Sequence, residues 1–441
     1  MLLEFRVKNF KTFKDEIIFS MIPAQKIKDI EYSVLKSGEI AKKAYKALSS
    51  AVIYGPNAAG KTNIISAMEV LKNIILSGSI KNDNNTSGTP NEAVRRLELI
   101  PNSKSLDSDP VEFGIRFIEH NCLFEYELKL DIGKFLNDKY DRKILDEKLS
   151  VNSRMIFNRC DTVEIGNLDI IKKYLINDFD HSTSEKMAKS NLDAKELFLS
   201  SMFRSVISKK LVDIITSWFR KKFICIYQSN RVSLRILGID EKINSIKNID
   251  NDTYEAIKQF GVTTNDICYI SPKDGAEALP HSMVQINNEE FKAIPIEFYE
   301  SYGTERFLSI FPLILVALDT GSTLIIDEFD ASIHPMALMS IVGAFHNNEI
   351  NINNAQLIFN THNPIFLNKN LFRRDEIKFV ERDDETGHSN HYSLSDFKTS
   401  GLHGVRKTDD YMKNYFINQY GAIRNIDFSD ILKDNLQKEE V

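Results

Sequence analysis

The eight residues GPNAAGKT at positions 55–62 combine glycines, a lysine and a threonine at the spacing of a phosphate-binding loop. Gly55 and Gly60 leave room for backbone N–H groups to wrap closely around a phosphate, and Lys61 brings a cation to the outer phosphates. The hydroxyl of Thr62 is a suitable magnesium ligand. A strand pattern precedes the loop and a helical pattern follows it, which is the context that such a loop requires. The sequence therefore predicts a site for a nucleoside triphosphate and Mg²⁺.

The acidic pair Asp327 and Glu328 follows four apolar residues in TLIIDEFDASIHP. At the end of a buried strand, Asp327 can hold a magnesium ion directly or through water, and Glu328 can orient and deprotonate an attacking water. An acidic strand end is usually only solvated, but beside a phosphate loop it predicts hydrolysis. A second apolar run, LIFNTHNP, leads to His362. This side chain could contact a γ-phosphate, or it could be hydrogen-bonded within a turn.

The stretch ESYGTERFLSIF, residues 300–311, places Ser301, Gly303 and Thr304 just before a strongly apolar run. Small hydrogen-bonding residues at the start of a helix suit the capture of an anion. The stretch by itself does not say which anion is captured. It also leaves open whether that anion belongs to this chain or to another copy of it.

The composition is that of an ordinary globular chain of 441 residues, 42% apolar and 27% charged, with a formal net charge of −6. This charge argues against a surface that is basic throughout, so a nucleic acid would have to bind a local patch. The longest apolar stretch, residues 307–318, is shorter than the roughly 20 residues that cross a bilayer. The first residues lack a signal-peptide pattern, and the four cysteines lie far apart. A cytoplasmic protein with reduced thiols and no zinc site is expected.

Two kinds of pattern predict the fold class. Between residues 305 and 381, buried strand patterns alternate with helical patterns, which indicates an α/β fold with a mainly parallel, helix-covered sheet. Residues 1–20 and 110–131 alternate with a period of two, which indicates an antiparallel β lobe. From about 133 to 225 the pattern becomes helical and polar, and we interpret this segment as an insertion.

The order of phosphate loop, small-residue helix start, acidic strand end and strand-end histidine resembles the heads of ABC-type ATPases, and most closely the SMC and RecF-like branch. In that family the small-residue helix start is the signature motif, which binds the γ-phosphate held by the opposite subunit. The resemblance implies that Ser301, Gly303 and Thr304 contact ATP on another copy of the chain, and that two chains associate head to tail. The stretch SYGTER departs from the Leu-Ser-Gly-Gly form of transporters and repair heads.

Within this branch the sequence is similar to the AAA-type ATPases of bacterial abortive-infection and phage-defence operons, the AbiL/RloA-like proteins. Four stretches carry the similarity: EFRVKNFKTFKDEIIFSM, GPNAAGKTN, SYGTERFL and the tail from RRDEIKFVERDDETG. It implies that Asn57 and Asn63 belong to the nucleotide site. Lys11 and Thr12 match an N-terminal loop that touches nucleotide phosphates in repair ATPases. The family's linking glutamine has no clear equivalent: LFLSSM fits its position but contains no glutamine, and Gln228 is a second candidate.

The resemblance also predicts how the chain is divided. An ABC-type ATPase head with an antiparallel β lobe and a helical insertion is expected. Its parts would be the N-terminal half of the head (1–132), a mainly helical inserted subdomain (133–225), the C-terminal half of the head (226–381) and a C-terminal tail, a possible partner-docking element (382–441).

Three functions remain open at this stage. The first is a slowly hydrolysing ATP switch of an anti-phage system, which controls a separately encoded TOPRIM-like or other nuclease. The second is a RecF-like ATPase that clamps DNA, which the net charge does not favour. The third is a scaffold that binds ATP without turnover, and the intact Glu328 and His362 argue against it. Two Asp-x-Asp pairs, Asp178/Asp180 and Asp250/Asp252, lie in polar stretches, and we expect no nuclease within the chain itself.

Overall fold

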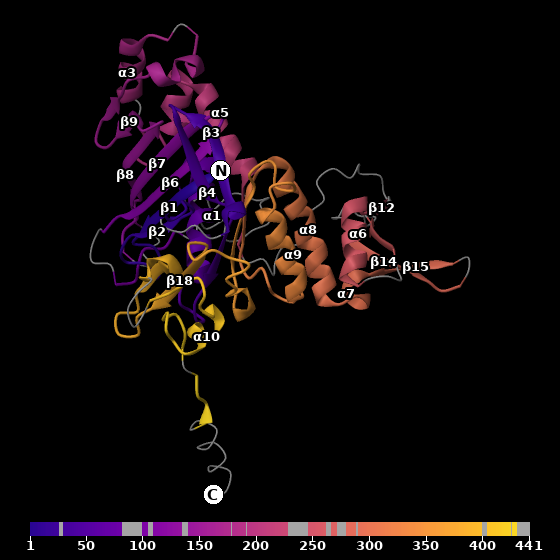
Figure 1. Cartoon of the computed structure of the whole chain (residues 1–441). Helices are drawn as coiled ribbons and strands as arrows, with labels where there is room; N and C mark the ends of the chain where they lie inside the picture. The colour runs from indigo at the N-terminus through magenta and orange to yellow at the C-terminus, as the bar shows by residue number, and fades with distance from the viewer. Residues whose placement is uncertain are drawn as a thin grey trace, which may run out of the picture.

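The computed structural model describes most of the chain and places its elements in one molecule (Figure 1). The described residues are 1–25, 30–81, 99–104, 109–134, 140–177, 179–190, 192–227, 246–261, 266–270, 279–287, 290–398, 404–424 and 426–429. Within them, no helix is both long and apolar enough to span a membrane.

A six-stranded sheet forms the centre of the head, in the order β11-β16-β17-β5-β18-β19. Its first five strands are mutually parallel, and only β19 runs antiparallel to its neighbour. The bounds are β5 Ser50–Tyr54, β11 Phe223–Ile226, β16 Thr323–Ile326, β17 Gln356–Asn360, β18 Ile377–Arg382 and β19 Ser389–Ser393. Strands β5, β16 and β17 are buried at every position, as parallel strands covered on both faces must be. The predicted α/β sheet is confirmed.

Alternate residues of this sheet face two different hydrophobic cores. Ala51 and Ile53 pack with helix α1 (Lys61–Ser77) and with the β lobe, whereas Val52 and Tyr54 pack with helices α8 (Tyr302–Thr320) and α9 (Pro335–His346). The pleat of β5 therefore joins the two layers of the head, because successive side chains of a strand point to opposite faces.

The β lobe is a seven-stranded antiparallel sheet in the order β10-β9-β8-β7-β6-β1-β2. Its bounds are β1 Leu2–Lys8, β2 Ile17–Ser20, β6 Val111–Glu119, β7 Cys122–Asp131, β8 Lys143–Val151, β9 Arg154–Arg159 and β10 Val163–Ile165. The β6–β7 hairpin turns at His120 and Asn121, which both have positive φ, as a two-residue hairpin turn requires.

Strands β8 to β10 extend this sheet through residues that the sequence analysis assigned to the helical insertion. In KILDEKLSV charged and apolar residues do not alternate: Leu145 is exposed and Glu147 is fully buried, so the strand lacks the period of two that marks an amphipathic strand. Among the described residues of that segment, helical structure begins at Asp169. The elements are 3₁₀ helix η2 Asp169–Tyr174, α3 His181–Ser190, π-helix η3 Leu199–Phe203, α4 Arg204–Val206, α5 Lys209–Ser217 and π-helix η4 Trp218–Lys222.

A second lobe, which the sequence patterns did not separate from the head, projects beside α8 (Figure 1). Its described strands form an antiparallel sheet in the order β12-β13-β14-β15. The elements are β12 Ile246–Asn248, α6 Asn251–Phe260, β13 Asp266–Ile270, β14 Leu279–Gln285, β15 Phe291–Pro295 and α7 Ile296–Tyr299. The strands are short and mostly half-buried, which explains their weak sequence signal.

The remaining elements are small. They are 3₁₀ helix η1 Glu31–Ser33, the paired strands β3 Val34–Ile40 and β4 Lys43–Leu48, the 3₁₀ helices η6 Pro364–Phe366 and η7 Leu394–Asp396, and helix α10 Tyr411–Phe416 of the tail.

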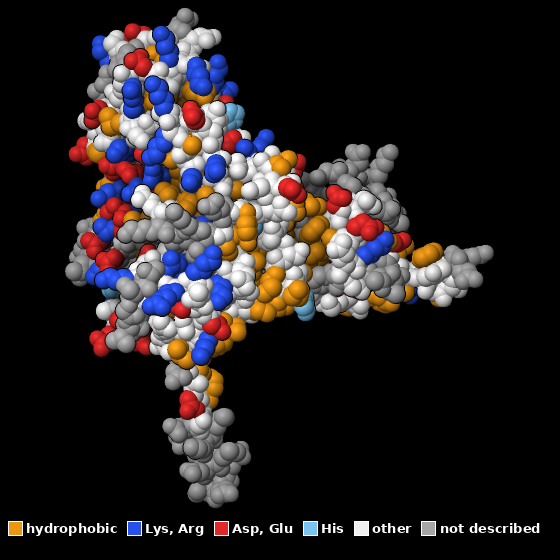
Figure 2. Space-filling view, in the orientation of Figure 1, with side chains coloured by type: hydrophobic (Ala, Val, Ile, Leu, Met, Phe, Trp, Pro, Cys, Tyr) orange, Lys and Arg blue, Asp and Glu red, His pale blue; other side chains and the backbone are white. Residues whose placement is uncertain are grey.

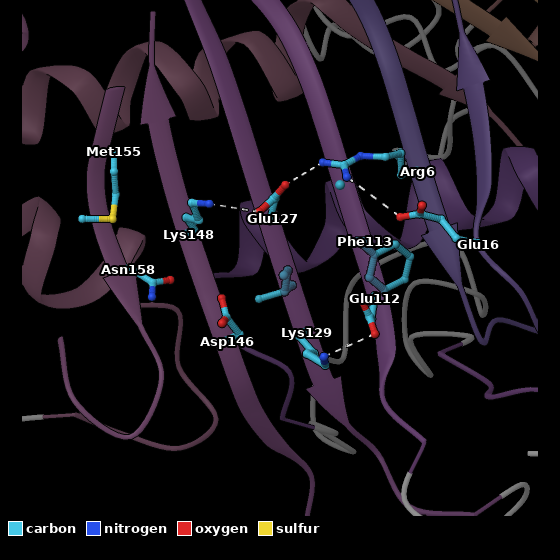
Figure 3. A pocket seen from close by; sticks show the side chains of 12 residues that line it. Arg6, Glu16, Glu112, Phe113, Glu127, Lys129, Asp146, Lys148, Met155 and Asn158 are labelled. Carbon is cyan, nitrogen blue, oxygen red and sulfur yellow. Dashed lines mark hydrogen bonds and ion pairs between the residues drawn. The ribbon is translucent and has the colours of Figure 1, made fainter. Parts of the chain in front are cut away.

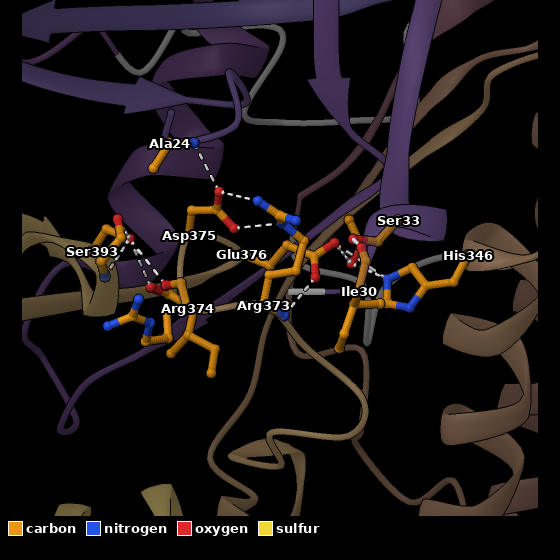
Figure 4. Close-up of polar contacts among 12 residues, drawn as sticks. Ala24, Ile30, Ser33, His346, Arg373, Arg374, Asp375, Glu376 and Ser393 are labelled. Carbon is orange, nitrogen blue, oxygen red and sulfur yellow. Dashed lines mark hydrogen bonds and ion pairs between the residues drawn. The ribbon is translucent and has the colours of Figure 1, made fainter. Parts of the chain in front are cut away.

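A buried polar network fixes the edge of the sheet that lies away from the phosphate loop (Figure 4). The Ser50 hydroxyl lies 2.8 Å from His346 Nε2 and donates to Glu376 Oε1 at 3.0 Å. Nearby, the Arg373 guanidinium donates two hydrogen bonds to Asp375, each of 2.9 Å. These contacts join β5, α9 and the segment before β18. Because these contacts pair Ser50 of the first half with His346 and Glu376 of the second, the network holds the two sequence halves of the head together.

Candidate functional site

The phosphate loop connects β5 to α1, and both of its glycines are required by their surroundings. At Gly55 a Cβ atom would lie 2.2 Å from the Val380 carbonyl oxygen. Gly60 has φ +113°, and a Cβ there would lie 2.8 Å from Thr12 Oγ1 and 2.9 Å from Ser389 Oγ. The loop is therefore held between the N-terminal segment and the β18–β19 hairpin, in a conformation that only glycine fits.

Lys61 lies inside this loop with only 6% of its surface exposed. Its ammonium group donates to the carbonyl oxygens of Gly55 at 2.8 Å and Pro56 at 3.0 Å. Burial lowers the pKa of Lys61 to about 8, and nearby carboxylates, first that of Asp327, oppose this effect. A buried cation at the mouth of a glycine loop fits the outer phosphates of a nucleotide.

The acidic pair lies at the end of β16, directly beside this loop. Asp327 is buried, and its Oδ1 accepts hydrogen bonds from Thr62 Oγ1 at 3.0 Å and from Asn360 Nδ2 at 2.5 Å. Glu328 is exposed and has φ +51°, a left-handed conformation that is uncommon outside glycine. Its backbone N–H donates to Asn360 Oδ1. The carboxylate of Glu328 is thus available to a ligand, while that of Asp327 is held in place.

His362 follows β17 and faces the same cavity. Burial, and then the charge of Lys61, lower the pKa of His362, while nearby carboxylates raise it. The imidazole is therefore uncharged at neutral pH and can donate a hydrogen bond from one ring nitrogen. The cavity has a volume of about 190 Å³ and is lined by Asn57, Ala58, Gly60, Lys61, Thr62, Asn63, Glu328, Asn360 and His362.

Thr62 and Asp327 are the predicted magnesium ligands, and their direct contact fits that role. Within the described part of the chain, no group of three or more His, Cys, Asp or Glu side chains could hold a metal ion. A hydroxyl and a single carboxylate suit Mg²⁺, which usually keeps several waters and takes phosphate oxygens as further ligands.

Lys11 and Thr12, the predicted N-terminal contacts to the nucleotide, touch two different positions of helix α1. Thr12 Oγ1 accepts a hydrogen bond from Asn63 Nδ2 at 2.9 Å, so Thr12 touches the start of α1. Lys11 donates to Ser66 Oγ at 2.7 Å, further along the same helix. Neither residue lines the cavity that contains Lys61. Both nevertheless support the helix that the phosphate loop opens.

The predicted signature residues are at the start of α8 and outside this cavity. Ser301 is the N-cap of the helix, and its hydroxyl accepts the backbone N–H of Thr304 at 3.2 Å. At Gly303 a Cβ would lie 2.5 Å from the Ser332 carbonyl oxygen, so the helix start packs against the loop that follows the acidic pair. Within one chain, the signature is therefore separate from the phosphate loop.

Sequence reasoning missed Asn360, which contacts both members of the acidic pair. A usable signal existed, because Asn360 is a polar residue at the end of the strand that neighbours β16. Two further predictions concern the Asp-x-Asp pairs and the linking glutamine. Asp250 caps helix α6 by accepting the Thr253 N–H at 2.8 Å, and Gln228 and Asp178 lie outside the described residues.

A wider hollow of about 420 Å³ lies on the β lobe (Figure 3). Charged side chains line it in opposite-sign pairs: Arg6 contacts Glu127 at 2.6 Å, and Lys129 contacts Glu112 at 3.4 Å. Lys129 and Glu112 lie on the adjacent strands β7 and β6, whereas Arg6 on β1 reaches across β6 to Glu127 on β7. The charges on this polar face of the sheet thus satisfy one another. We therefore place the candidate site at the phosphate loop.

Residues 50–165 and 172–368 match the model of a family described as "AAA domain, putative AbiEii toxin, Type IV TA system". The matched segments contain the phosphate loop, the acidic pair and His362. The chain belongs to this family. It carries an ATPase domain of the AAA class, and the resemblance to abortive-infection ATPases is confirmed at the level of the AbiEii type.

Solved structures of SMC heads are similar to the chain, and no curated protein matches it. An SMC head bound to the C-terminal winged-helix domain of ScpA is 12% identical, covers 89% of this chain and 97% of its own, and has a TM-score of 0.37. The SMC head domain from Thermotoga maritima is 13% identical, covers 89% of this chain and 98% of its own, and has a TM-score of 0.33. A third structure is an Smc head with an extended coiled coil, bound to the C-terminal domain of ScpA derived from Pyrococcus furiosus. It is 11% identical, covers 90% of this chain and 97% of its own, and has a TM-score of 0.38.

Proposed function

We propose that the chain is an ATP-driven switch subunit of a bacterial anti-phage system, which binds and slowly hydrolyses ATP and controls a separate toxic effector. The observation that carries the ATPase part is the meeting of Lys61, Thr62, Glu328 and His362 in one cavity, with Asp327 behind them. Binding, metal coordination and water activation need these residue types within one site.

Binding would come from the loop and catalysis from the strand ends. The backbone N–H groups around Gly60 and the ammonium of Lys61 would hold the β- and γ-phosphates. Mg²⁺, held by Thr62 and Asp327, would neutralise charge on the phosphate oxygens. Glu328 would take a proton from the water that attacks the γ-phosphate, and the products are ADP and phosphate. His362, which is uncharged at neutral pH, would donate a hydrogen bond to the γ-phosphate.

The position of the signature supports a site shared between two copies. Ser301 is exposed and lies outside the cavity of its own chain, so it can face the site of a partner, while Gly303 and Thr304 are buried directly behind it. Exposed hydrophobic side chains gather on the face that carries α7, α8 and α9 (Figure 2). Tyr302 and Met336, at the starts of α8 and α9, are 52% and 65% exposed. A head-to-tail dimer would cover such a surface.

The output of the switch would be a second protein. Among the described residues, no cluster of His, Cys, Asp and Glu could hold a catalytic metal, and Asp250 serves as a helix cap. The family's description names a toxin of a toxin–antitoxin system, which supports a toxic outcome. An ATPase of this kind acts by shifting a two-state equilibrium, and closure of the dimer provides one.

Purification from cells that carry the neighbouring open reading frame tests the assignment. A nuclease that co-elutes with the chain, and is lost in the presence of a Lys61→Ala substitution, supports the switch. Co-elution of DNA alone would instead favour a RecF-like DNA clamp. Absence of ATP hydrolysis by the pure chain at every Mg²⁺ concentration would contradict both.

A further inference from the structure

Asn360 ends β17 and is 1% exposed, so its amide is almost fully enclosed beside the acidic pair. We propose that Asn360 is the positioning residue of this pair, fixing the carboxylate of Asp327 and the backbone of Glu328 with one side chain. The inference rests on the proposed ATPase function and adds to it a residue that acts through the metal ligand and the general base.

The two hydrogen bonds of Asn360 determine the orientation of its amide. Its NH₂ group donates to Asp327 Oδ1 at 2.5 Å, and its oxygen accepts the N–H of Glu328. A flipped amide would place an oxygen against the Asp327 carboxylate and an NH₂ group against the Glu328 N–H, so both contacts would be repulsive. Only asparagine supplies a donor and an acceptor at this length.

The peptide unit around Glu328 is held from two sides of the molecule. Asn360, on β17, holds its N–H, and Arg306, on α8, donates to its carbonyl oxygen at 3.4 Å. Between these contacts Glu328 adopts φ +51°. Left-handed conformations of non-glycine residues persist only where the surroundings enforce them. The pair of contacts therefore fixes the direction in which the Glu328 carboxylate leaves the backbone.

The same strand end makes a second, separate contact. The Thr361 hydroxyl donates to Asp330 Oδ2 at 2.6 Å, which anchors the loop after the acidic pair. Asn360 differs from Thr361 in touching the two acids themselves. Since Lys61 and the loop N–H groups hold the phosphates without help from Asn360, its loss should affect turnover far more than nucleotide affinity.

The test compares Asn360→Asp and Asn360→Ala with a matched control, Asn363→Ala. Asn363 lies three positions along the same segment, and its side chain caps η6 by accepting the Ile365 N–H at 3.1 Å, away from the cavity. We expect kcat to fall about 10- to 100-fold in both Asn360 variants, the range for lost hydrogen bonds to charged groups. Affinity for a fluorescent ATP analogue should stay within about threefold. The control Asn363→Ala should keep the kcat and the ATP-analogue affinity of the wild type.

The split between affinity and turnover separates positioning from simple support of the fold. Asn360→Asp should lose turnover and keep its affinity for the ATP analogue, because the residue acts on the two acids and not on the phosphates. Equal losses of affinity and turnover would show a structural role and overturn the inference. Wild-type kcat in Asn360→Asp would also overturn it. If Lys61→Ala stops hydrolysis while the Asn360 variants remain normal, only this inference fails; a wild-type chain without hydrolysis overturns both proposals.

Discussion

The hydroxyl of Thr62 donates a hydrogen bond to Asp327 Oδ1 at 3.0 Å, although 265 positions separate the two residues in the chain. The contact joins the first turn of α1, the helix that follows β5, to the end of β16. Strands β5 and β16 belong to the same sheet and run parallel. Because carboxyl ends of parallel strands meet at one edge, the phosphate loop and the acidic pair are brought together by the sheet itself. This arrangement leads to the first prediction.

Lys61→Ala should abolish ATP binding, whereas Glu328→Gln should keep binding and lose hydrolysis. The first change removes the cation from the phosphates in the ground state, while the second removes the base that is needed only in the transition state. Binding of a fluorescent ATP analogue and release of phosphate, measured on the same preparations, distinguish the two effects. Equal turnover by wild type and Glu328→Gln would refute the catalytic assignment of Glu328.

Mixing two inactive variants should restore activity if the sites are shared. Lys61→Ala damages the phosphate loop, and Ser301→Arg damages the signature at the start of α8. In a mixed dimer both lesions can fall on one site, which leaves the other intact. ATPase activity recovered on mixing is the expected outcome. No recovery at any ratio, with dimers detected by sedimentation, would count against the trans arrangement.

Gly60→Ala should lower the free energy of unfolding by about 1–3 kcal/mol, the cost of holding a non-glycine residue in a strained backbone conformation. The new Cβ would meet Thr12 Oγ1 and Ser389 Oγ within 2.9 Å, at a φ of +113°. The matched control is Gly343→Ala in the middle of α9, where a Cβ would meet no atom within 4 Å. There alanine should stabilise the helix by about 0.5–1 kcal/mol. Thermal unfolding of the two variants should therefore shift in opposite directions.

The stability of the protein should decrease on acidification because of His391. Its ring lies on β19, 5.6 Å from that of Phe19, and burial together with the charge of Lys378 lowers its pKa to about 3. An unfolded histidine titrates near 6.5. Between these values the unfolded state binds more protons, so the contribution of His391 is complete above pH 6.5 and is lost as the pH falls toward 3.

Protonation of this one residue can lower the free energy of unfolding by about 1.4 kcal/mol for each pH unit. His391→Gln removes it, so the difference in unfolding free energy between pH 7 and pH 5 should be smaller in the variant than in the wild type. Urea unfolding at both pH values measures that difference. An unchanged pH dependence would show that His391 is protonated as easily in the folded protein as in the unfolded chain.

The sequence predicted the central sheet because its parallel strands are unbroken apolar runs, such as SAVIY before the phosphate loop. It did not predict β8 as a strand, since apolar and charged residues do not alternate in KILDEKLSV, where Glu147 is buried and Leu145 is exposed. The structure brings two of the residues predicted from separate motifs, Thr62 and Asp327, into direct contact, with Lys61 next to Thr62 in the loop. Asn360 was missed because its partners lie on a neighbouring strand, 32 and 33 positions away, and no local pattern records that contact. The roles of these residues stay predictions until they are tested.

The purified chain should not cleave nucleic acid by itself, and toxicity or phage protection should require a second gene. The described residues contain no cluster suited to a catalytic metal, and Asp250 is occupied as the N-cap of α6. Incubation of the chain with DNA, RNA, ATP and Mg²⁺ is the direct measurement, and expression of each gene alone and together is its counterpart in cells. Toxicity should appear only with both genes and should disappear with Lys61→Ala, because the proposed switch depends on bound ATP to shift its two-state equilibrium. Cleavage that survives further purification and is lost in Asp250→Ala or Asp178→Ala would rule out the two-component arrangement.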